Sequence, residues 1–144
     1  MRLFAVAALL VASSAIAQTA DEAALASVRS LKCEFPFLAV NEWEQDQPTP
    51  KLKKQDFAFH IDGVDLSQGQ ARIIGNAGSE DLITMVGNGV LHFVERTPSG
   101  NLNVTSVFAT RSQARKFKAV HSRHVFIAGG PLPSQAYGYC QTWE

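Results

Sequence analysis

Residues 56–62 read Asp56-Phe57-Ala58-Phe59-His60-Ile61-Asp62, and this stretch decides the fold class. Its three large apolar side chains stand at every second position, with small or polar residues between them. Successive side chains of a β-strand point to opposite faces of a sheet, so one face of this segment is apolar and the other polar. Such alternation is typical of an antiparallel sheet with one buried face. The stretch therefore predicts a half-buried antiparallel strand.

Similar segments recur along the rest of the chain, separated by short turn signals. Asn88-Gly89 and Pro98-Ser99-Gly100-Asn101 tolerate the dihedral angles of tight turns, as do residues 65–69 and 76–78. The turn signals follow one another at roughly 8–12 residues, a spacing typical of all-β sandwiches and barrels. The further candidate strands are residues 33–37, 70–75, 81–86, 90–97, 101–110, 116–126 and 136–141.

The two cysteines, Cys33 and Cys140, lie in the first and the last of these candidate strands. A meander of seven or eight strands has two open edges, and closing the sheet on itself removes both. Closure makes the first and last strands neighbours, where a Cys33–Cys140 disulfide can join them. We therefore expect an all-β fold, a small antiparallel meander that forms a closed or nearly closed barrel. An open sandwich and a pair of free buried thiols are the alternatives.

A short helix is predicted ahead of the strands, and two proline-containing loops are predicted between them. Apolar residues spaced along one helix face predict a helix over about residues 20–30. Residues 41–54 contain two prolines, and residues 129–134 contain two more beside two glycines. Each proline disfavours helix at the preceding residue and marks a break in regular structure, so we expect both segments to be loops.

Residues 1–17 have the three parts of a secretory signal peptide. Arg2 supplies the positive charge, residues 3–12 the apolar run, and Ala15-Ile16-Ala17 the small residues that a signal peptidase recognises. The apolar run is shorter than the roughly 20 residues that span a bilayer. We expect cleavage after this stretch, which leaves residues 18–144 as a single β domain in a secreted or periplasmic, oxidising location. A buried N-terminal helix or a retained anchor is the alternative.

In outline, this organisation resembles that of the lipocalins. The shared features are a leader, a helix or arm, a tryptophan ahead of the first long strand, a β-meander and a disulfide near the end of the chain. The tryptophan stands in Asn41-Glu42-Trp43, which has no glycine where the lipocalin G-x-W motif has one. The resemblance therefore concerns architecture alone and implies no function.

The charges are distributed unevenly, although the whole chain has a formal net charge of +0. Residues 18–95 hold 12 acidic and six basic side chains, and no acidic residue lies between Arg96 and Trp143. The basic residues from Arg96 onward are Arg96, Arg111, Arg115, Lys116, Lys118 and Arg123. This asymmetry predicts a basic surface for an anionic polysaccharide, lipid headgroup or acidic protein, and gives no indication of nucleic acid. Neutralisation between paired strands is the alternative.

The densest group of polar side chains is His121-Ser122-Arg123-His124. On a strand, His121 and His124 point to opposite faces, so they cannot chelate a metal together, and we predict neither a metal nor a cofactor. His121 and Arg123 share a face, where an imidazole and a guanidinium can bind a phosphate or a carboxylate. The predicted ligand-binding residues are His121, Arg123, His124, Arg115 and Lys118.

Signatures of common enzyme classes are missing from the sequence. It contains no G-x-S-x-G, no H-E-x-x-H and no Walker-type glycine loop. The sequence therefore favours a secreted or periplasmic binding protein without catalytic activity, which holds either a small ligand in the barrel mouth or an anionic envelope component. The alternative is a small secreted enzyme inhibitor or hydrolase that uses His121, Arg123 and His124, so enzymatic activity stays an open question.

Overall fold

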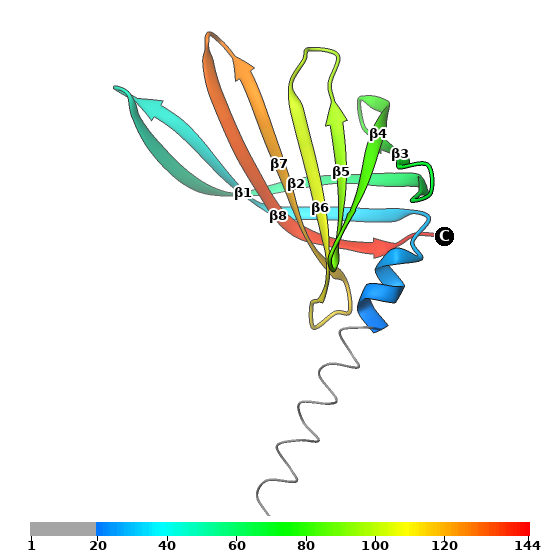
Figure 1. Ribbon diagram of the computed structural model, residues 1–144. Helices are drawn as coiled ribbons and strands as arrows, with labels where there is room; N and C mark the ends of the chain where they lie inside the picture. Colours follow the sequence, from blue (N-terminus) through cyan, green and yellow to red (C-terminus); the bar gives the residue numbers. More distant parts are fainter. Residues whose placement is uncertain (1–19) are drawn as a thin grey trace, which may run out of the picture.

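The computed structural model describes residues 20–144, and in this range the chain forms a ring of eight antiparallel strands (Figure 1). The strands are β1 (Leu31–Glu44), β2 (Gln47–Asp65), β3 (Gln70–Gly75), β4 (Gly78–Gly87), β5 (Val90–Arg96), β6 (Leu102–Arg111), β7 (Phe117–Ile127) and β8 (Gly130–Thr142). Each strand pairs with the next along the chain, and β8 pairs with β1, so the meander closes. The predicted all-β, closed antiparallel meander is confirmed.

The predicted N-terminal helix is also confirmed, but it ends earlier than expected. Residues 20–26 are helical, and the chain then turns into β1. Leu25 on the helix and Val28 just after it are each only 2% exposed and pack into the core. The predicted signal peptide, residues 1–17, lies outside the described residues.

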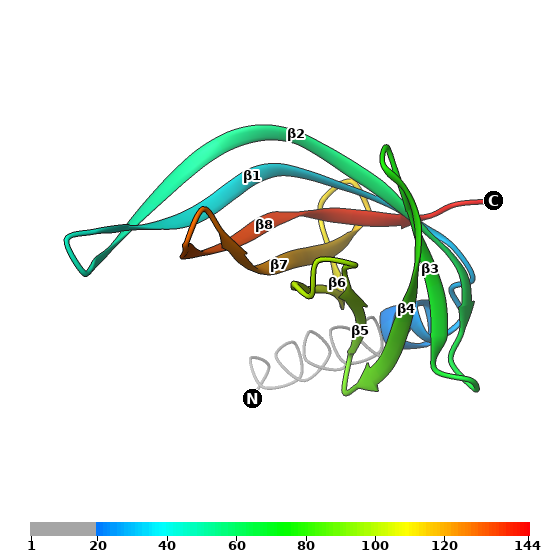
Figure 2. The same cartoon turned by 90° about the horizontal axis from the view of Figure 1, so that it is seen from above.

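The ring is not a regular barrel, because its strands differ in length and spread apart at one end. β1 and β2 span 14 and 19 residues, whereas β3 spans 6. The turns that follow β1, β3, β5 and β7 all lie at one end, and the helix lies at the other (Figure 1). Seen from above, the β1–β2 hairpin extends well beyond the rest of the ring (Figure 2). We call the end with these four turns the mouth and the end with the helix the base.

The prediction of loops over residues 41–54 and 129–134 is wrong, since most of these residues belong to long hairpins. β2 pairs with β3 only from His60 onward, so the edge of β2 that carries Pro48 and Pro50 is free. Proline cannot donate a hydrogen bond to a neighbouring strand but is tolerated on a free edge. The prolines at the start of β8 are in the same situation, because β8 pairs with β1 only as far as Ser134.

The interior of the ring changes from apolar at the base to polar at the mouth. Inward-facing residues of β5, β6, β7 and β8 stand opposite one another in three cross-strand rows. From base to mouth, the base row is Leu91–Val107–Ala119–Gly138, the middle row is Phe93–Thr105–His121–Ala136, and the mouth row is Glu95–Asn103–Arg123–Ser134. The base row and the helix enclose an apolar core, and the mouth row holds an acid, an amide, a base and a hydroxyl.

The strand predicted from residues 56–62 has the predicted faces. Phe59 and Ile61 are 4% and 0% exposed and point into the ring, where the ring of Phe59 stacks on that of Phe35 at 5.3 Å. His60 points outward, and its ring centroid lies 5.1 Å from that of Trp143. The period of two in the sequence therefore places the apolar face inside the ring.

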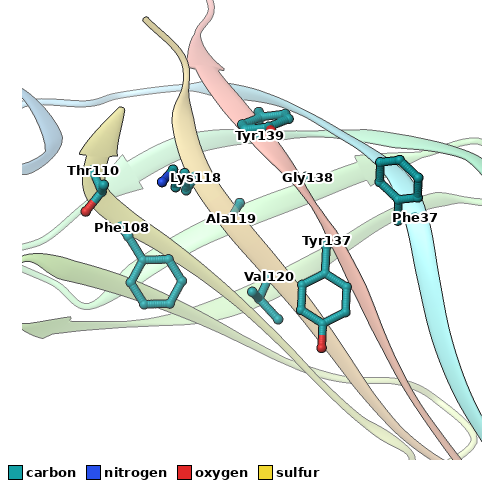
Figure 3. A pocket seen from close by; sticks show the side chains of 9 residues that line it. All are labelled: Phe37, Phe108, Thr110, Lys118, Ala119, Val120, Tyr137, Gly138 and Tyr139. Carbon is teal, nitrogen blue, oxygen red and sulfur yellow. The ribbon is translucent and has the colours of Figure 1, made fainter. Parts of the chain in front are cut away.

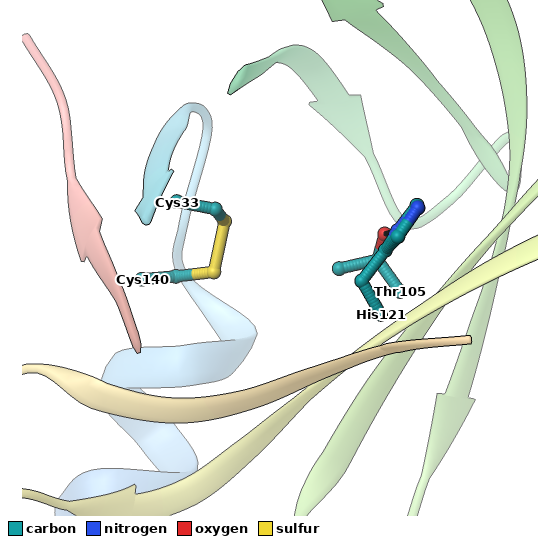
Figure 4. The surroundings of a disulfide bond; sticks show 4 residues. All are labelled: Cys33, Thr105, His121 and Cys140. Atoms are coloured by element: carbon teal, nitrogen blue, oxygen red, sulfur yellow. Dashed lines mark hydrogen bonds between the residues drawn. A yellow bond between two sulfur atoms is a disulfide. The ribbon is translucent and has the colours of Figure 1, made fainter. Parts of the chain in front are cut away.

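The seam between β1 and β8 carries the predicted disulfide, which is confirmed. Cys33 stands opposite Cys140, and the two Cα atoms are 4.1 Å apart. Both residues are fully buried, and Figure 4 shows the bond between their sulfur atoms. Just above the disulfide, β1 contains a bulge between Phe35 and Phe37, and Gly138 of β8 lies against it. A Cβ atom on Gly138 would be 2.7 Å from the Cα atom of Phe35, closer than real Cβ contacts, so glycine is required here.

We predict that Gly138→Ala destabilises the protein strongly, because the added methyl group meets backbone atoms of β1 that cannot move without opening the seam. The free energy of unfolding should fall by at least about 2 kcal/mol. Gly130→Ala is the matched control on the same strand, since no atom lies within 4 Å of an added Cβ atom. Urea denaturation followed by tryptophan fluorescence measures both. Equal stability of the two variants would contradict the packing described for this seam.

Candidate functional site

A cavity of about 580 Å³ opens at the mouth of the ring. Phe57, Phe59 and Ile73, from β2 and β3, form an apolar wall. Polar side chains come from the mouth row and the middle row on β5, β6 and β7. The turns between β3 and β4 and between β5 and β6 border the opening. An apolar wall that faces a few converging polar groups is the usual make-up of a small-molecule site.

The aromatic wall is held in place by ring contacts. The rings of Phe57 and Phe59 meet edge to face at 5.4 Å between centroids, and Phe35 lies behind both. Contacts of this kind stabilise the orientation of each ring beyond simple burial. The wall is therefore a preformed surface for the apolar part of a ligand.

His121 forms part of the cavity lining but is almost fully buried. It is 3% exposed, and its ring lies 5.3–5.8 Å from the rings of Phe35, Phe57 and Phe59. Its Nδ1 atom shares a 2.9 Å hydrogen bond with Oγ1 of Thr105 (Figure 4). Burial lowers the pKa of His121 to about 4, and the positive charge of Arg123 adds to this effect. The imidazole is therefore neutral at neutral pH.

Glu95 and Asn103 stand side by side in the mouth row. The Nδ2 atom of Asn103 donates a 2.8 Å hydrogen bond to Oε2 of Glu95. The Oδ1 atom of Asn103 has no hydrogen-bond partner among residues 20–144, although the residue is only 8% exposed. A buried acceptor without a partner costs roughly 1–3 kcal/mol. This carbonyl is the clearest sign of an unfilled interaction in the cavity.

The five predicted ligand-binding residues do not come together at one place. His121 and Arg123 share the interior face of β7 and both line the cavity. His124 and Lys118 are exposed on the outer face of the same strand. Arg115 lies in the turn between β6 and β7 at the base, and its side chain is 79% exposed. A ligand in the mouth can therefore contact only the first two, and a binding role for each of the five stays a prediction.

Part of the basic C-terminal half is neutralised by acids from the N-terminal half. Nε of Arg111 lies 3.0 Å from a carboxylate oxygen of Asp21, and Nζ of Lys116 lies 3.1 Å from a carboxylate oxygen of Glu34. The hydrogen bond from Lys116, and then that from Lys32, lower the pKa of Glu34 below its usual value. Neither contact joins two paired strands, because Asp21 lies in the helix and Glu34 lies on β1, which pairs with β2 and β8. Arg123 and Lys118 form no ion pair within the described residues.

Sequence reasoning missed Glu95 and Asn103. A signal for Glu95 was present in the sequence. Residues two apart on a strand share a face, so Glu95 is expected on the same inward face as Leu91 and Phe93. A charged residue at an inward position is unusual unless it is paired or functional. The pairing of Asn103 with Glu95 depends on the register between β5 and β6, which the sequence pattern does not determine.

A second, shallower groove of about 340 Å³ lies on the outer wall of the ring (Figure 3). It is formed by β1, β6, β7 and β8, and its largest side chains are Phe37, Phe108, Tyr137 and Tyr139. The two tyrosines are about two-fifths exposed, and Lys118 lies between the strands that carry the rings. This groove faces away from the interior and has no polar side chain that is buried without a partner.

No protein-family model matches this chain, and comparisons with curated proteins and with solved structures found no match either. Across residues 20–144, no three or more His, Cys, Asp or Glu side chains are grouped so that they could hold a metal ion. In the same range, no helix has the length and apolar character needed to cross a membrane. The site is therefore interpreted from its own geometry.

We predict that His121 makes the stability of the protein depend on pH. The folded state keeps the imidazole neutral down to a pKa of about 4, whereas the ordinary value is 6.5. Between these values the unfolded state binds more protons, so stability is fully present above pH 6.5 and is lost as the pH falls toward 4. From about pH 7.5 to about pH 5, this contribution to the free energy of unfolding falls by about 2 kcal/mol.

The measurement is urea denaturation at both pH values for the wild type, His121→Asn and the matched control His124→Asn. Asparagine at 121 does not titrate but can still hydrogen-bond to Thr105, so this variant should lose most of the pH dependence in this range. The control removes an exposed imidazole on the same strand and should keep the wild-type dependence. The same loss of pH dependence in both variants would contradict the role of burial at His121.

Proposed function

We propose that this protein is a secreted or periplasmic binding protein that holds a small ligand in the cavity at the mouth of the ring. One observation carries the proposal. A preformed aromatic wall faces converging polar groups across a single cavity, and among those groups the buried Oδ1 atom of Asn103 has no partner within the described residues. A ligand that supplies a hydrogen-bond donor would remove this cost. The ligand is expected to be amphipathic, with an apolar body against Phe57 and Phe59 and a polar group toward the mouth row.

The hydroxyl–imidazole pair of Thr105 and His121 is compatible with catalysis but does not favour it. A histidine that acts as a general base must carry a proton in the transition state, and its pKa is best near the working pH. Burial among three aromatic rings lowers the pKa of His121 to about 4, which makes protonation unfavourable. His124, on the other face of β7, cannot reach the same substrate. These features support binding more than hydrolysis.

An anionic macromolecule is a less favoured partner, because the basic side chains are dispersed. Lys118 lies on the outer wall, Arg115 at the base and Arg123 at the mouth. Cationic side chains on three different parts of the surface do not form the continuous patch that attracts a polyanion. The cavity therefore supports a small ligand better than an extended charged one.

We predict that the neutral fluorescent probe N-phenyl-1-naphthylamine binds the mouth cavity with one saturable site. Its rings fit the aromatic wall, and its N–H group can donate to Asn103. Ala77→Trp places a large side chain at an exposed turn position that borders the cavity and should weaken binding at least about tenfold. Phe57→Leu, which removes one ring of the wall, should weaken it as well. Fluorescence titration measures all affinities, and circular dichroism checks folding.

Tyr137→Ala is the control for probe binding in the outer groove. The substitution removes one aromatic ring from that groove and leaves the mouth cavity unchanged. It should leave probe binding unchanged. Loss of binding in Tyr137→Ala together with normal binding in Ala77→Trp would place the probe on the outer wall and would contradict the proposal.

We also predict that the chain is exported and processed. Expressed with its own N-terminus in a bacterial host, it should appear in the periplasmic fraction as a chain that begins at Gln18 and contains the Cys33–Cys140 disulfide. Intact-mass analysis with and without reductant measures both features. Ala17→Leu removes the small residue at the cleavage site and should leave an unprocessed precursor. A wild-type chain that stays cytoplasmic and begins at Met1 would show that the leader does not work as proposed.

A further inference from the structure

Glu95 and Asn103, the two less exposed polar residues of the mouth row on β5 and β6, offer hydrogen-bond acceptors to the cavity. The Nδ2 atom of Asn103 is committed to Glu95, because a carboxylate can only accept, and this fixes the orientation of the amide. The Oδ1 atom of Asn103 is left without a donor among residues 20–144. Glu95 is half-buried, and in the same range it accepts a side-chain hydrogen bond only from Asn103. A ligand group that meets these two side chains must therefore donate.

The charge of the lining has the same implication. Two inward-facing carboxylates line the cavity, those of Glu80 and Glu95, against the single guanidinium of Arg123 among the described lining residues. None of these three forms an ion pair with another described residue. Glu95 is the less exposed of the two carboxylates, so its field is screened less by water. The cavity is therefore complementary to a positive charge.

Arg123 forms no ion pair with Glu95. It stands opposite Asn103, which in turn stands opposite Glu95, so two strand spacings separate Arg123 from Glu95. Neighbouring strands lie about 5 Å apart, which puts roughly 10 Å between the two backbones. Arg123 is also exposed, whereas Asn103 is buried. The guanidinium is thus the more solvent-exposed group of the mouth row, and the two acceptors are more buried.

The wall opposite the acceptors suits the remainder of such a ligand. Phe57 and Phe59 present aromatic surface to the same cavity, with Ile73 beside them. Aromatic faces pack against apolar groups and also attract a nearby ammonium group. A molecule with an amine at one end and an apolar ring or chain at the other would use both sides of the cavity.

We infer that the ligand of the mouth cavity is a small protonated amine with an apolar body. Its N–H groups donate to Oδ1 of Asn103 and to the carboxylate of Glu95, and its apolar body packs on Phe57 and Phe59. This inference rests on the proposed function, because it assigns a chemical class to the ligand of the same cavity. A hydrogen bond between an ammonium and a carboxylate is about twice as strong as one between neutral groups, so charge should dominate selectivity.

The test uses three probes of similar shape that differ in charge. They are the cation of 2-(1-naphthyl)ethylamine, the neutral 2-(1-naphthyl)ethanol and the anion of 1-naphthaleneacetic acid. Each is titrated against bound N-phenyl-1-naphthylamine at about pH 7.5. The amine should displace the fluorophore at least about tenfold more tightly than the alcohol, and the anion should be the weakest.

Two isosteric variants make the test specific for the acceptors. Glu95→Gln keeps the size of the side chain but removes its charge, so the advantage of the amine over the alcohol should fall to less than about threefold while the alcohol binds as before. Glu44→Gln is the matched control, since the Glu44 side chain is 62% exposed on the β1–β2 hairpin, outside the cavity lining. It should keep the full advantage of the amine.

The possible failures are distinct. If the alcohol binds as tightly as the amine, or if the anion binds best and Arg123→Gln abolishes its binding, the inference about the amine is wrong while a ligand-binding cavity stands. If N-phenyl-1-naphthylamine does not bind at all, the proposed function fails and the amine inference fails with it. An amine advantage that Glu95→Gln removes and Glu44→Gln preserves supports both.

Discussion

Closure of the ring at the β1–β8 seam is the constraint on which the rest of the structure depends. Without this pairing the meander would have two open edges and no enclosed interior. The Cys33–Cys140 disulfide joins the two strands across a sequence separation of 107. In the chain-entropy model a loop of this length destabilises the unfolded state by up to about 4–5 kcal/mol. Gly138 lets the backbones of β1 and β8 approach each other beside the bulge of β1. The close backbone packing and the disulfide therefore hold the seam together at the same place.

The bulge in β1 also separates the closed part of the ring from its spread mouth. Below it Phe35 points inward; above it the inward residues are Leu38 and Val40, and Phe37 faces out. An extra residue in one strand bends that strand and increases its local twist. The hairpin of β1 and β2 therefore leaves the ring at this level. The outward turn of Phe37 also contributes one wall of the outer groove, so a single irregularity shapes both concave surfaces.

The sequence predicted those features that follow from side-chain period and turn chemistry. Alternation around Phe59 and the spacing of turns suffice for the all-β meander, and closure follows from the edges and the two cysteines. The prediction of loops at the hairpin prolines was wrong. Whether a proline is tolerated in a strand depends on whether the edge of that strand is free, and this is a tertiary property. For the site, the shared face of His121 and Arg123 follows from parity alone. The pairing of Glu95 with Asn103 depends on the register of two strands, which parity does not fix.

The interior of the ring changes from apolar side chains at the base to polar ones at the mouth, and this change explains how unpartnered polar groups can be tolerated at the mouth. Polar groups without partners are costly inside a small domain, and Asn103 carries a cost of roughly 1–3 kcal/mol. The apolar base row, the helix and the disulfide stabilise the other end of the ring and do not involve the mouth row. Stability is therefore concentrated at the base, so the mouth can retain acceptors that would be unfavourable in a core. Because Asn103 is fixed by its bond to Glu95, the unused carbonyl is already oriented before a ligand arrives, which reduces the ordering cost of binding.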